Sequence, residues 1–390
     1  MTSLTQEILD LEMQLKCIRE NIIGDWKDET CWKDFMETVQ STKEQLAENF
    51  GKSLHRLGNF KPEESTIESV VKKFPDAMKI GGSKNRLPIQ SCLWNKDGYK
   101  YIPLLAREGV KHNVGGEESR GGLFTSDPSY ANGRFNILQQ AVNVHATYGT
   151  KKEFDEDVVK MLESLKMDGL LKKEDVSEYN LIWYSSSCCP MRFKYLVQLD
   201  PDNISSFLME GKTFMHYLIH CLKDLCHLKS ILKVTLELHP EQAGYLFQKD
   251  TNGQQAAVEK AFEEYGEKET MVALNEIISP AQQFPILHHA LVHAPKAQSI
   301  FMQWFPWAYN LRDHNNRSLI QAILAAGPKV VDATVFASMS DEQICEKDPV
   351  TKLYPFAAVA SGEDGDLEKS FYLLRRQPGV LDRSTTRTTM

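Results

Sequence analysis

The feature that most constrains how this chain folds is a degenerate internal repeat that begins near residue 63. Each copy opens with a polar or glycine-containing turn, which leads into a short apolar helix. The positions that we align as equivalent are Cys92, Ala141, Leu218, Ala261, Ala290, Ala322 and Ala358, at steps of 49, 77, 43, 29, 32 and 36 residues. A helical pair of this size cannot bury its apolar face alone, so neighbouring copies must complete a continuous core. The repeat therefore predicts an all-α fold, an α-solenoid of helical hairpins, and its two longest steps predict insertions or an unrecognised copy.

The best-preserved copy covers residues 85–114. Its opening reads Leu87-Pro88-Ile89-Gln90-Ser91-Cys92, and its second helix is expected to end with a left-handed cap at Gly109. This pattern resembles the ankyrin repeat, and most closely the divergent ankyrin-like proteins of the kind expanded in unicellular algae. The resemblance extends in outline over residues 63–378 and includes the stretches PLLxxEGxxxxVGGxxxRGGL at 103–123 and LYPFxxAxxxxxxDLExxxxLLRRxP at 353–378. A HEAT-like array would accept the same periodicity but predicts longer first helices.

Second helices of the repeats are expected at Thr66–Phe74, Val158–Leu165, Lys229–Leu238, Ala297–Phe305 and Leu367–Gln377. In an ankyrin opening a histidine normally hydrogen-bonds the neighbouring turn, so the resemblance implies structural roles for His288 and His289. The glycine-rich run at 115–122 is interpreted as a flexible finger loop between repeats.

The ankyrin resemblance implies a non-catalytic scaffold that binds a protein partner on its concave face and finger loops. No cofactor is expected. Trp and Tyr are favoured anchors in such contacts. The candidate partner-binding residues lie in the turns, the glycine-rich run and an aromatic cluster, and they are Asn85, Arg86, Trp94, Arg120, Arg134, Trp304, Trp307, Tyr309 and Asn316.

Residues 1–60 are predicted to form a helical hairpin ahead of the repeat array at 61–378, and 379–390 a flexible polar tail. A heptad seam runs through Leu4, Ile8, Leu11, Leu15, Ile18 and Ile22, the spacing of a coiled coil. A second helix is expected over residues 32–50, ending at Gly51. The seam can either pack within the hairpin or form a homodimer through residues 4–22.

Charge and hydropathy exclude some classes of partner. The 390 residues carry a formal net charge of −8, which argues against a broad nucleic-acid interface. No stretch approaches the length of an apolar membrane span. The first residues contain Glu7, Asp10 and Glu12 and resemble neither a secretory nor a transit peptide, so we expect a cytoplasmic or nuclear protein.

A competing hypothesis is a metal- or redox-dependent sensor or enzyme. His216 and His220 are spaced i, i+4 on one predicted helix, and Cys226 and His227 follow closely, as in some zinc sites. The adjacent pair Cys188-Cys189 could respond to oxidants if it is exposed near Arg192 and Lys194. The apolar residues around the histidines favour a buried structural helix instead.

Overall fold

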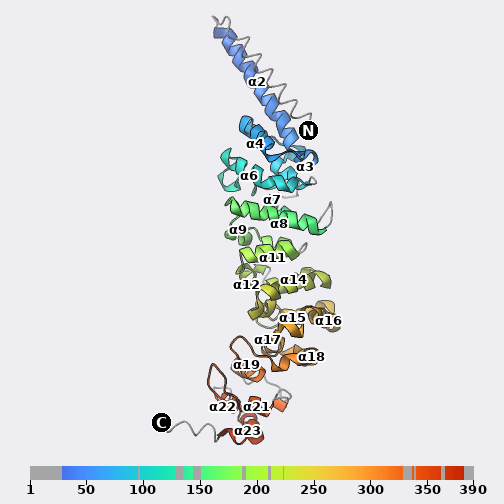
Figure 1. Cartoon of the computed structure of the whole chain (residues 1–390), viewed down its shortest axis with the longest axis vertical. Coiled ribbons are helices and arrows are strands. Elements are labelled where there is room, and N and C mark those ends of the chain that lie inside the picture. Colours follow the sequence, from blue (N-terminus) through green and yellow to red (C-terminus); the bar gives the residue numbers. More distant parts are fainter. Residues whose placement is uncertain are drawn as a thin grey trace, which may run out of the picture. The chain divides into compact units, whose positions relative to one another are not determined.

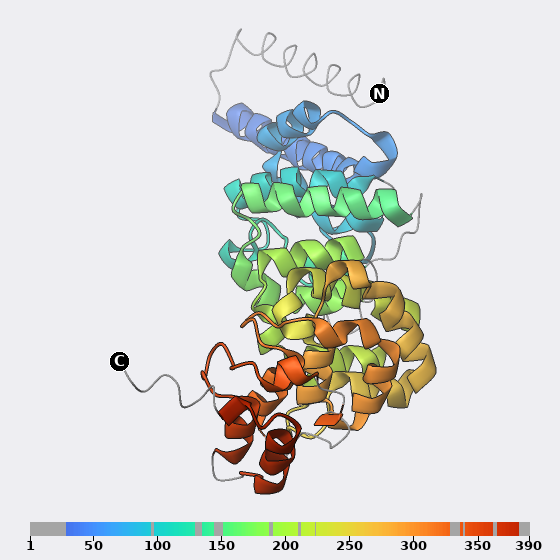
Figure 2. The same ribbon diagram turned by 60° about the horizontal axis from the view of Figure 1, so that its bottom comes forward.

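The computed structural model describes residues 29–94, 97–128, 135–143, 151–186, 190–209, 212–222, 224–327, 336–337, 340–361 and 365–381. In these ranges the chain is mostly helical. Its β structure consists of a small hairpin, which pairs Leu208 with Thr213 and Met209 with Lys212, and two isolated bridges, Lys249 with Ala256 and Arg312 with Ser318. The prediction of an all-α fold is therefore confirmed. The chain divides into two compact units, residues 1–201 and 202–390, and each has its own set of buried apolar side chains. Figures 1 and 2 show the helices of both units, coloured along the sequence. No helix in the described ranges combines the length and apolarity needed to cross a bilayer.

The first unit is built from helices joined by short turns. Its helices are α2 (Glu29–Leu54), α3 (Leu57–Phe60), α4 (Glu64–Lys73), α5 (Pro88–Ser91), α6 (Ile102–Lys111), α7 (Ile137–Asn143), α8 (Lys151–Met167), α9 (Lys173–Glu178), α10 (Leu181–Ser186) and α11 (Pro190–Leu199). Turns of 3₁₀ helix lie at Pro75–Lys79, Ser83–Asn85, Cys92–Trp94, Gly98–Tyr101 and Glu117–Ser119. The heptad at 4–22 lies outside the described residues, as does the tail at 382–390.

The second predicted helix is present, but its expected end at Gly51 is wrong. Helix α2 continues through Gly51 to Leu54 and packs against the 3₁₀ turn at Pro75–Lys79. A Cβ atom on Gly51 would lie 2.6 Å from the Cβ of Ile80, so glycine serves here for close approach and does not terminate the helix.

The glycine-rich run at 115–122 does not project freely as a finger loop. The Ser119 hydroxyl is buried and donates to the Val114 carbonyl at 2.7 Å. Gly109 lies inside α6 and not at its cap, and a Cβ atom there would meet the Gly121 carbonyl oxygen at 2.5 Å. The expected cap at Gly109 is therefore wrong. Residues 119–122 fold back onto α6, where Gly109 and Gly121 let the backbones touch, whereas residues 115–118 are exposed as a loop.

The first unit also contains a copy of the repeat that the sequence alignment missed. Helix α10 contacts α7, and α11 contacts both α10 and α8, so α10 and α11 form a further helical pair. Its opening lies at Asn180, 44 residues after Asn136 and 33 before Thr213. The long step between Ala141 and Leu218 is therefore explained by an unrecognised copy.

The second unit repeats the same arrangement. Its elements are α12 (Asn203–Ser206), β1 (Leu208–Met209), β2 (Lys212–Thr213), α13 (Phe214–Cys221), α14 (Leu225–Leu238), α15 (Ala257–Tyr265), α16 (Glu267–Ile277), α17 (Ile286–His293), α18 (Gln298–Trp304), α19 (Leu319–Ala326), α21 (Asp341–Ile344), α22 (Pro355–Ala360) and α23 (Leu367–Arg376). Turns of 3₁₀ helix lie at Pro240–Tyr245, Pro280–Gln282, Pro295–Ala297 and Pro306–Asn310. First helices contact first helices, as α13 does α15, and second helices contact second helices, as α14 does α16.

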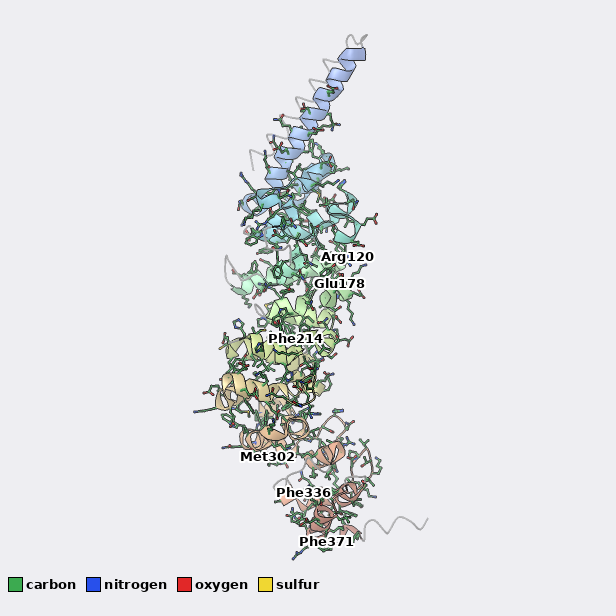
Figure 3. All side chains as sticks on the ribbon, turned by 180° about the vertical axis from the view of Figure 1, so that it is seen from behind. Arg120, Glu178, Phe214, Met302, Phe336 and Phe371 are labelled. Carbon is green, nitrogen blue, oxygen red and sulfur yellow. The ribbon has the colours of Figure 1, made fainter. Side chains whose placement is uncertain are left out.

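Fully buried aromatic side chains fill the core of the second unit, among them Phe214 (Figure 3), Phe301 and Phe305. The five predicted second helices are all present, as α4, α8, α14, α18 and α23.

A buried arginine ties three elements of the first unit together. Arg192 on α11 is only 1% exposed. Its guanidinium donates to the carbonyl oxygens of Ala141 and Val142, both at 3.1 Å, and forms an ion pair with Asp155 on α8. It also lies 4.9 Å from the centre of the Phe154 ring. Arg192 therefore caps the last turn of α7 and neutralises the buried Asp155.

We predict that Arg192→Met lowers the free energy of unfolding by about 3–5 kcal/mol, because it leaves the Asp155 carboxylate buried without its cation. The matched control is Arg107→Met, which removes the more exposed ion pair with Asp168 and should cost less than about 1 kcal/mol. Urea titration followed by circular dichroism measures both. Equal losses for the two variants would contradict the assignment.

Candidate interaction surface

Five of the helical pairs are preceded by a turn that one backbone hydrogen bond closes. We call these segments the hairpin turns. The closing bonds run from Gly82 N–H to the Arg86 carbonyl, from Asp127 to Phe135, from Asp250 to Gln255, from Asp313 to Arg317 and from Asp348 to Leu353, at 2.8–3.0 Å. In every case the residue after the acceptor directly precedes the first helix. The same local structure therefore recurs in both units, although the turns differ in length.

Aspartate side chains organise several of these turns from within. The Asp313 carboxylate accepts from the backbone N–H of Asn315 at 2.9 Å and of Arg317 at 2.8 Å. Asp348 does the same for Val350 and Thr351, and Asp250 for Gln254. Although burial opposes ionisation, these N–H donors lower the pKa of Asp250 and Asp348. The turns are thus rigid and carry ionised aspartates.

In five copies the third residue of the first helix links that helix to a following turn or loop. In three copies it is a glutamine whose Oε1 accepts from the N–H of the residue before the helix and whose Nε2 donates to a carbonyl further along the chain. The glutamines are Gln90, Gln139 and Gln321, and they donate to Thr125 and Ser126, to Tyr179 and to Glu346, respectively, at 3.0–3.3 Å. We call this arrangement the inter-repeat bridge.

Histidines occupy the same position in two further copies, but only His216 uses both ring nitrogens, since among the described residues the buried Nδ1 of His288 has no hydrogen-bond partner. His216 Nδ1 lies 2.7 Å from the Thr213 hydroxyl, and its Nε2 lies 3.0 Å from the Gln255 carbonyl. His288 Nε2 lies 3.3 Å from the Arg317 carbonyl. The structural role expected of His288 is confirmed. His289 instead stacks with the rings of Phe247 and Phe284.

Two arginines add an ion pair to the inter-repeat bridge. Arg86 and Arg317 both occupy the last position of a hairpin turn, and each pairs through Nε with the aspartate that begins the next one. The distances are 3.2 Å from Arg86 to Asp127 and 2.9 Å from Arg317 to Asp348. Both aspartates are buried. The equivalent geometry at two distant places in the sequence shows that the repeats share side-chain interactions as well as helices.

Two of the arginines predicted to bind a partner are used inside the protein. Besides its ion pair, the Arg86 guanidinium lies 4.5 Å from the centre of the Trp94 ring. Arg120 forms an ion pair with the buried Asp175 and donates to the Leu170 carbonyl at 3.1 Å (Figure 3 marks Arg120). Arg134 lies outside the described residues.

The other predicted partner-binding residues differ in exposure. Asn85 and Asn316 are exposed, and both have positive φ angles (58° and 59°), which asparagine tolerates well at turn tips. Trp94 is 47% exposed. The side chains of Trp304, Trp307 and Tyr309 are half-buried, and Trp307 packs edge-on against the buried Phe305.

Two neighbouring hairpin turns in the second unit form one surface, which we call the paired-turn surface (residues 313–317 and 346–353). Arg312 makes a bidentate ion pair with Glu346 at 2.8 and 2.9 Å, in addition to the links from Arg317 and Gln321. The side chains exposed on this surface are His314, Asn315, Asn316, Lys347, Val350, Thr351, Lys352 and Leu353. Val350 is 55% exposed, although it is apolar.

The proposed metal site does not assemble. Both ring nitrogens of His216 are engaged in the inter-repeat bridge. The Nδ1 atom of His220 lies 3.9 Å from a carboxylate oxygen of Glu264, and the Nδ1 atom of His227 lies 2.8 Å from a carboxylate oxygen of Asp224. Cys226 is exposed. Among the described residues no group of three or more His, Cys, Asp or Glu side chains could hold a metal ion. Cys188 and Cys189 lie outside the part of the chain that the structure describes.

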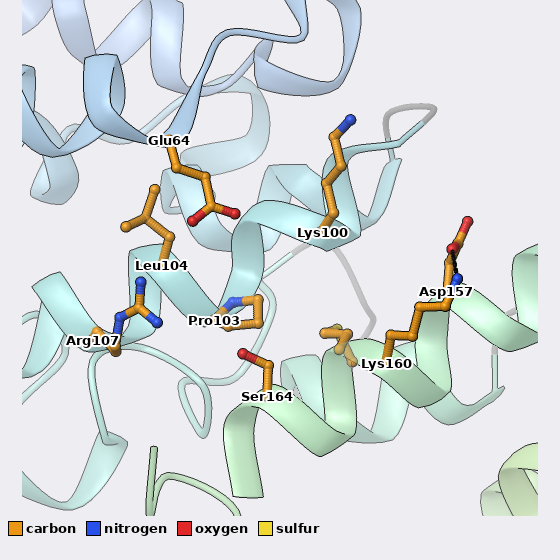
Figure 4. Close-up of a pocket in the computed structure, with 9 residues that line it drawn as sticks. Glu64, Lys100, Pro103, Leu104, Arg107, Asp157, Lys160 and Ser164 are labelled. Carbon is orange, nitrogen blue, oxygen red and sulfur yellow. Dashed lines mark hydrogen bonds and ion pairs between the residues drawn. The ribbon is translucent and has the colours of Figure 1, made fainter. Parts of the chain in front are cut away.

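A shallow cavity of about 230 Å³ lies between α4, α6 and α8 in the first unit (Figure 4). It is lined by Glu64, Lys100, Pro103, Leu104, Arg107, Asp157, Lys160, Met161 and Ser164. Its charges are largely paired, since Lys160 lies 3.3 Å from Asp157 and Arg107 lies 3.2 Å from Asp168. Such a lining offers neither a nucleophile with an adjacent base nor a focused charge.

No protein-family model, curated protein or solved structure matches this chain.

Sequence reasoning missed the bridging glutamines, although a sign of them was available. Aligned by the residue before the first helix, the openings place Gln90, Gln139, His216, His288 and Gln321 at the same position. Glutamine and histidine can each donate and accept at once, which the bridge requires. That shared chemistry, and not the apolar pattern, identifies the position.

We predict that His216→Gln keeps the free energy of unfolding near that of the native chain, because glutamine makes the same bridge in three other copies. His216→Ala should lower it by about 1–3 kcal/mol, since the Gln255 carbonyl and the Thr213 hydroxyl lose their partner. The exposed His220→Ala is the matched control and should change it by less than about 0.5 kcal/mol. Thermal and urea unfolding distinguish the variants, and equal loss for Gln and Ala would refute the bridge.

Stability should also fall on acidification. Burial lowers the pKa of His216 and His288 below 6.5 and that of His289 to about 4, with neighbouring histidines adding to the effect at His289. The unfolded chain therefore binds more protons than the folded chain below pH 6.5, and stability is lost as pH falls from 7 towards 5. Above pH 7 these histidines contribute no pH dependence.

Urea midpoints at pH 7, 6 and 5 measure how steeply stability depends on pH. The midpoint should change less with pH in the double variant His216→Gln, His288→Gln. An unchanged pH dependence in that variant would show that these histidines are not its origin.

Proposed function

We propose that this chain is a non-catalytic protein-interaction module, an ankyrin-like solenoid that binds a protein partner through its hairpin turns. The recurrence of the inter-repeat bridge supports the ankyrin-like relationship, because the same side-chain position connects five first helices to a following turn or loop. Each copy would bury the apolar face of its neighbour, so the stacked copies would form a solenoid with their turns along one edge.

The observation that carries this proposal is the combination of rigid backbone and exposed tips in the hairpin turns. Backbone bonds and aspartate side chains hold the turn at 348–353 in place, while Val350, Thr351 and Lys352 point outward. A partner that binds such a turn pays little conformational entropy for ordering it. Rigid turns with exposed side chains therefore suit recognition better than chemistry.

The paired-turn surface is the contact that we favour. It presents the apolar side chains of Val350 and Leu353 beside the amides of Asn315 and Asn316 and the ammonium groups of Lys347 and Lys352. Apolar side chains supply burial in a protein contact, and the amides and cations around them supply specificity. The partner would be a protein segment with an apolar side chain and nearby carboxylates.

The free thiols of Cys92, Cys221, Cys226 and Cys345 suit a reducing compartment, so we place the module in the cytosol or the nucleus. The net charge of −8 favours protein partners over nucleic acid.

Affinity enrichment with the tagged full chain tests the proposal. Proteins captured by the native chain should be lost about tenfold or more with Val350→Asp, because an aspartate buried in an apolar contact costs over 1 kcal/mol. Val272→Asp is the matched control, since Val272 is exposed on α16, away from the hairpin turns, and it should retain them.

The captured protein is then purified and titrated against the native chain and both variants. Equal affinity for all three would exclude the paired-turn surface as the contact. A turnover activity that survives Val350→Asp would argue against a purely binding role.

A further inference from the structure

The last helix of the second unit presents an apolar stripe that no described residue covers. On α23 the side chains of Leu367 and Phe371 are 76% and 68% exposed, and Tyr372 is 42% exposed. Ser370 and Leu373 face the opposite way, into the contact with α22. Figure 3 marks Phe371 on this helix. A contiguous exposed apolar stripe of this kind marks an interaction site, so it calls for an occupant.

Two charged residues flank the stripe. Glu368 and Arg375 are both exposed, and at 100° per residue they lie on the same side of α23 as Phe371. In the described part of the chain neither Glu368 nor Arg375 forms an ion pair. The nearby Arg376, in contrast, pairs with Asp341, and Lys369 pairs with Asp366. An acid therefore stands near the start of the exposed face and a base near its end.

This order of charges makes the stripe complementary to itself. The midpoint between Glu368 and Arg375 falls between Phe371 and Tyr372. If two copies of α23 pack antiparallel about a two-fold axis at that point, Glu368 of each copy faces Arg375 of the other. Phe371 then faces Tyr372 of the second copy, and the apolar stripes cover each other. A two-fold contact of this kind uses the same patch on both copies and closes, so it gives a dimer and not a filament.

We propose that α23 is a self-association surface whose occupant is α23 of a second copy, packed antiparallel. The segment that follows α23 is a poor alternative, since residues 382–390 contain a single apolar side chain, Met390, and cannot cover a stripe of two large residues and a tyrosine. This contact differs from the homodimer predicted through residues 4–22, and it is independent of the partner of the paired-turn surface.

Light scattering and sedimentation equilibrium of the full chain test the apolar part of the proposal. Phe371→Glu should abolish the association that α23 provides and so halve the mass of an α23-linked dimer, because it places two carboxylates at the centre of the contact. At protein concentrations at which the native chain is dissociated, the urea midpoint should stay unchanged, since Phe371 is mostly exposed. Met167→Glu, at a side chain that is 81% exposed on α8, is the matched control and should leave the mass unaltered.

Charge reversal tests the antiparallel geometry. Glu368→Arg alone and Arg375→Glu alone should each weaken association by a factor of about ten or more, since both symmetric pairs become repulsive. The double variant carrying both reversals should regain the native association, because the pairs re-form with exchanged signs. A native chain that stays monomeric at its highest soluble concentration would overturn the proposal. So would a mass that does not respond to Phe371→Glu, or a double variant as weak as either single one.

Discussion

The side chain at the third position of four first helices does two things at once, and much of the architecture depends on that combination. One of its polar atoms engages the residue that precedes its own helix, and another reaches a carbonyl further along the chain. Gln90, Gln139 and Gln321 do so with an amide whose oxygen accepts the N–H of that residue, and His216 does so with an imidazole that contacts the Thr213 hydroxyl. Helices as short as α5 (Pro88–Ser91) are not stable alone, because nucleating a helix is costly. The bridge therefore makes the formation of one helix depend on the placement of the next turn.

One copy shows what happens when the residue type cannot do both. Glu259 occupies the same position and accepts from the Ala256 N–H at 3.1 Å, so it still caps its helix. An ionised carboxylate has no proton to donate, and among the described residues its other oxygen is buried without a hydrogen-bond partner. Burial of apolar side chains such as Ala261 and Leu274 must hold this part of the second unit together without a bridge. Capping and bridging are thus separable, and only the bridge connects neighbouring copies.

The sequence predicted the helices of the repeat better than it predicted the contacts between them. Apolar periodicity located second helices such as α14 and α23, because the spacing of apolar residues within one helix indicates which face of it is buried. It missed the copy at α10, whose opening carries Trp183 at the position where the bridging copies have glutamine or histidine. Apolar periodicity also could not predict the roles of Arg86 and Arg120. Their acidic partners lie 41 and 55 residues away, and a charged side chain without a known partner is normally taken as exposed.

The placement of the bridge also explains why the repeat is so irregular in sequence. The hydrogen bond that closes a hairpin turn and the bridge that reaches it involve residues at or beside the ends of the turn, so they do not fix which side chains its tip carries. The turn at 313–317 and the longer segment from Asp127 to Phe135 each lead into a first helix, α19 and α7, after the same closing hydrogen bond. Because closing a longer loop costs only slightly more entropy, insertions at the tip change the step between copies with little effect on the core. The tips are thus the positions where the chain can change its surface chemistry while keeping its fold, which is the property that a binding module needs.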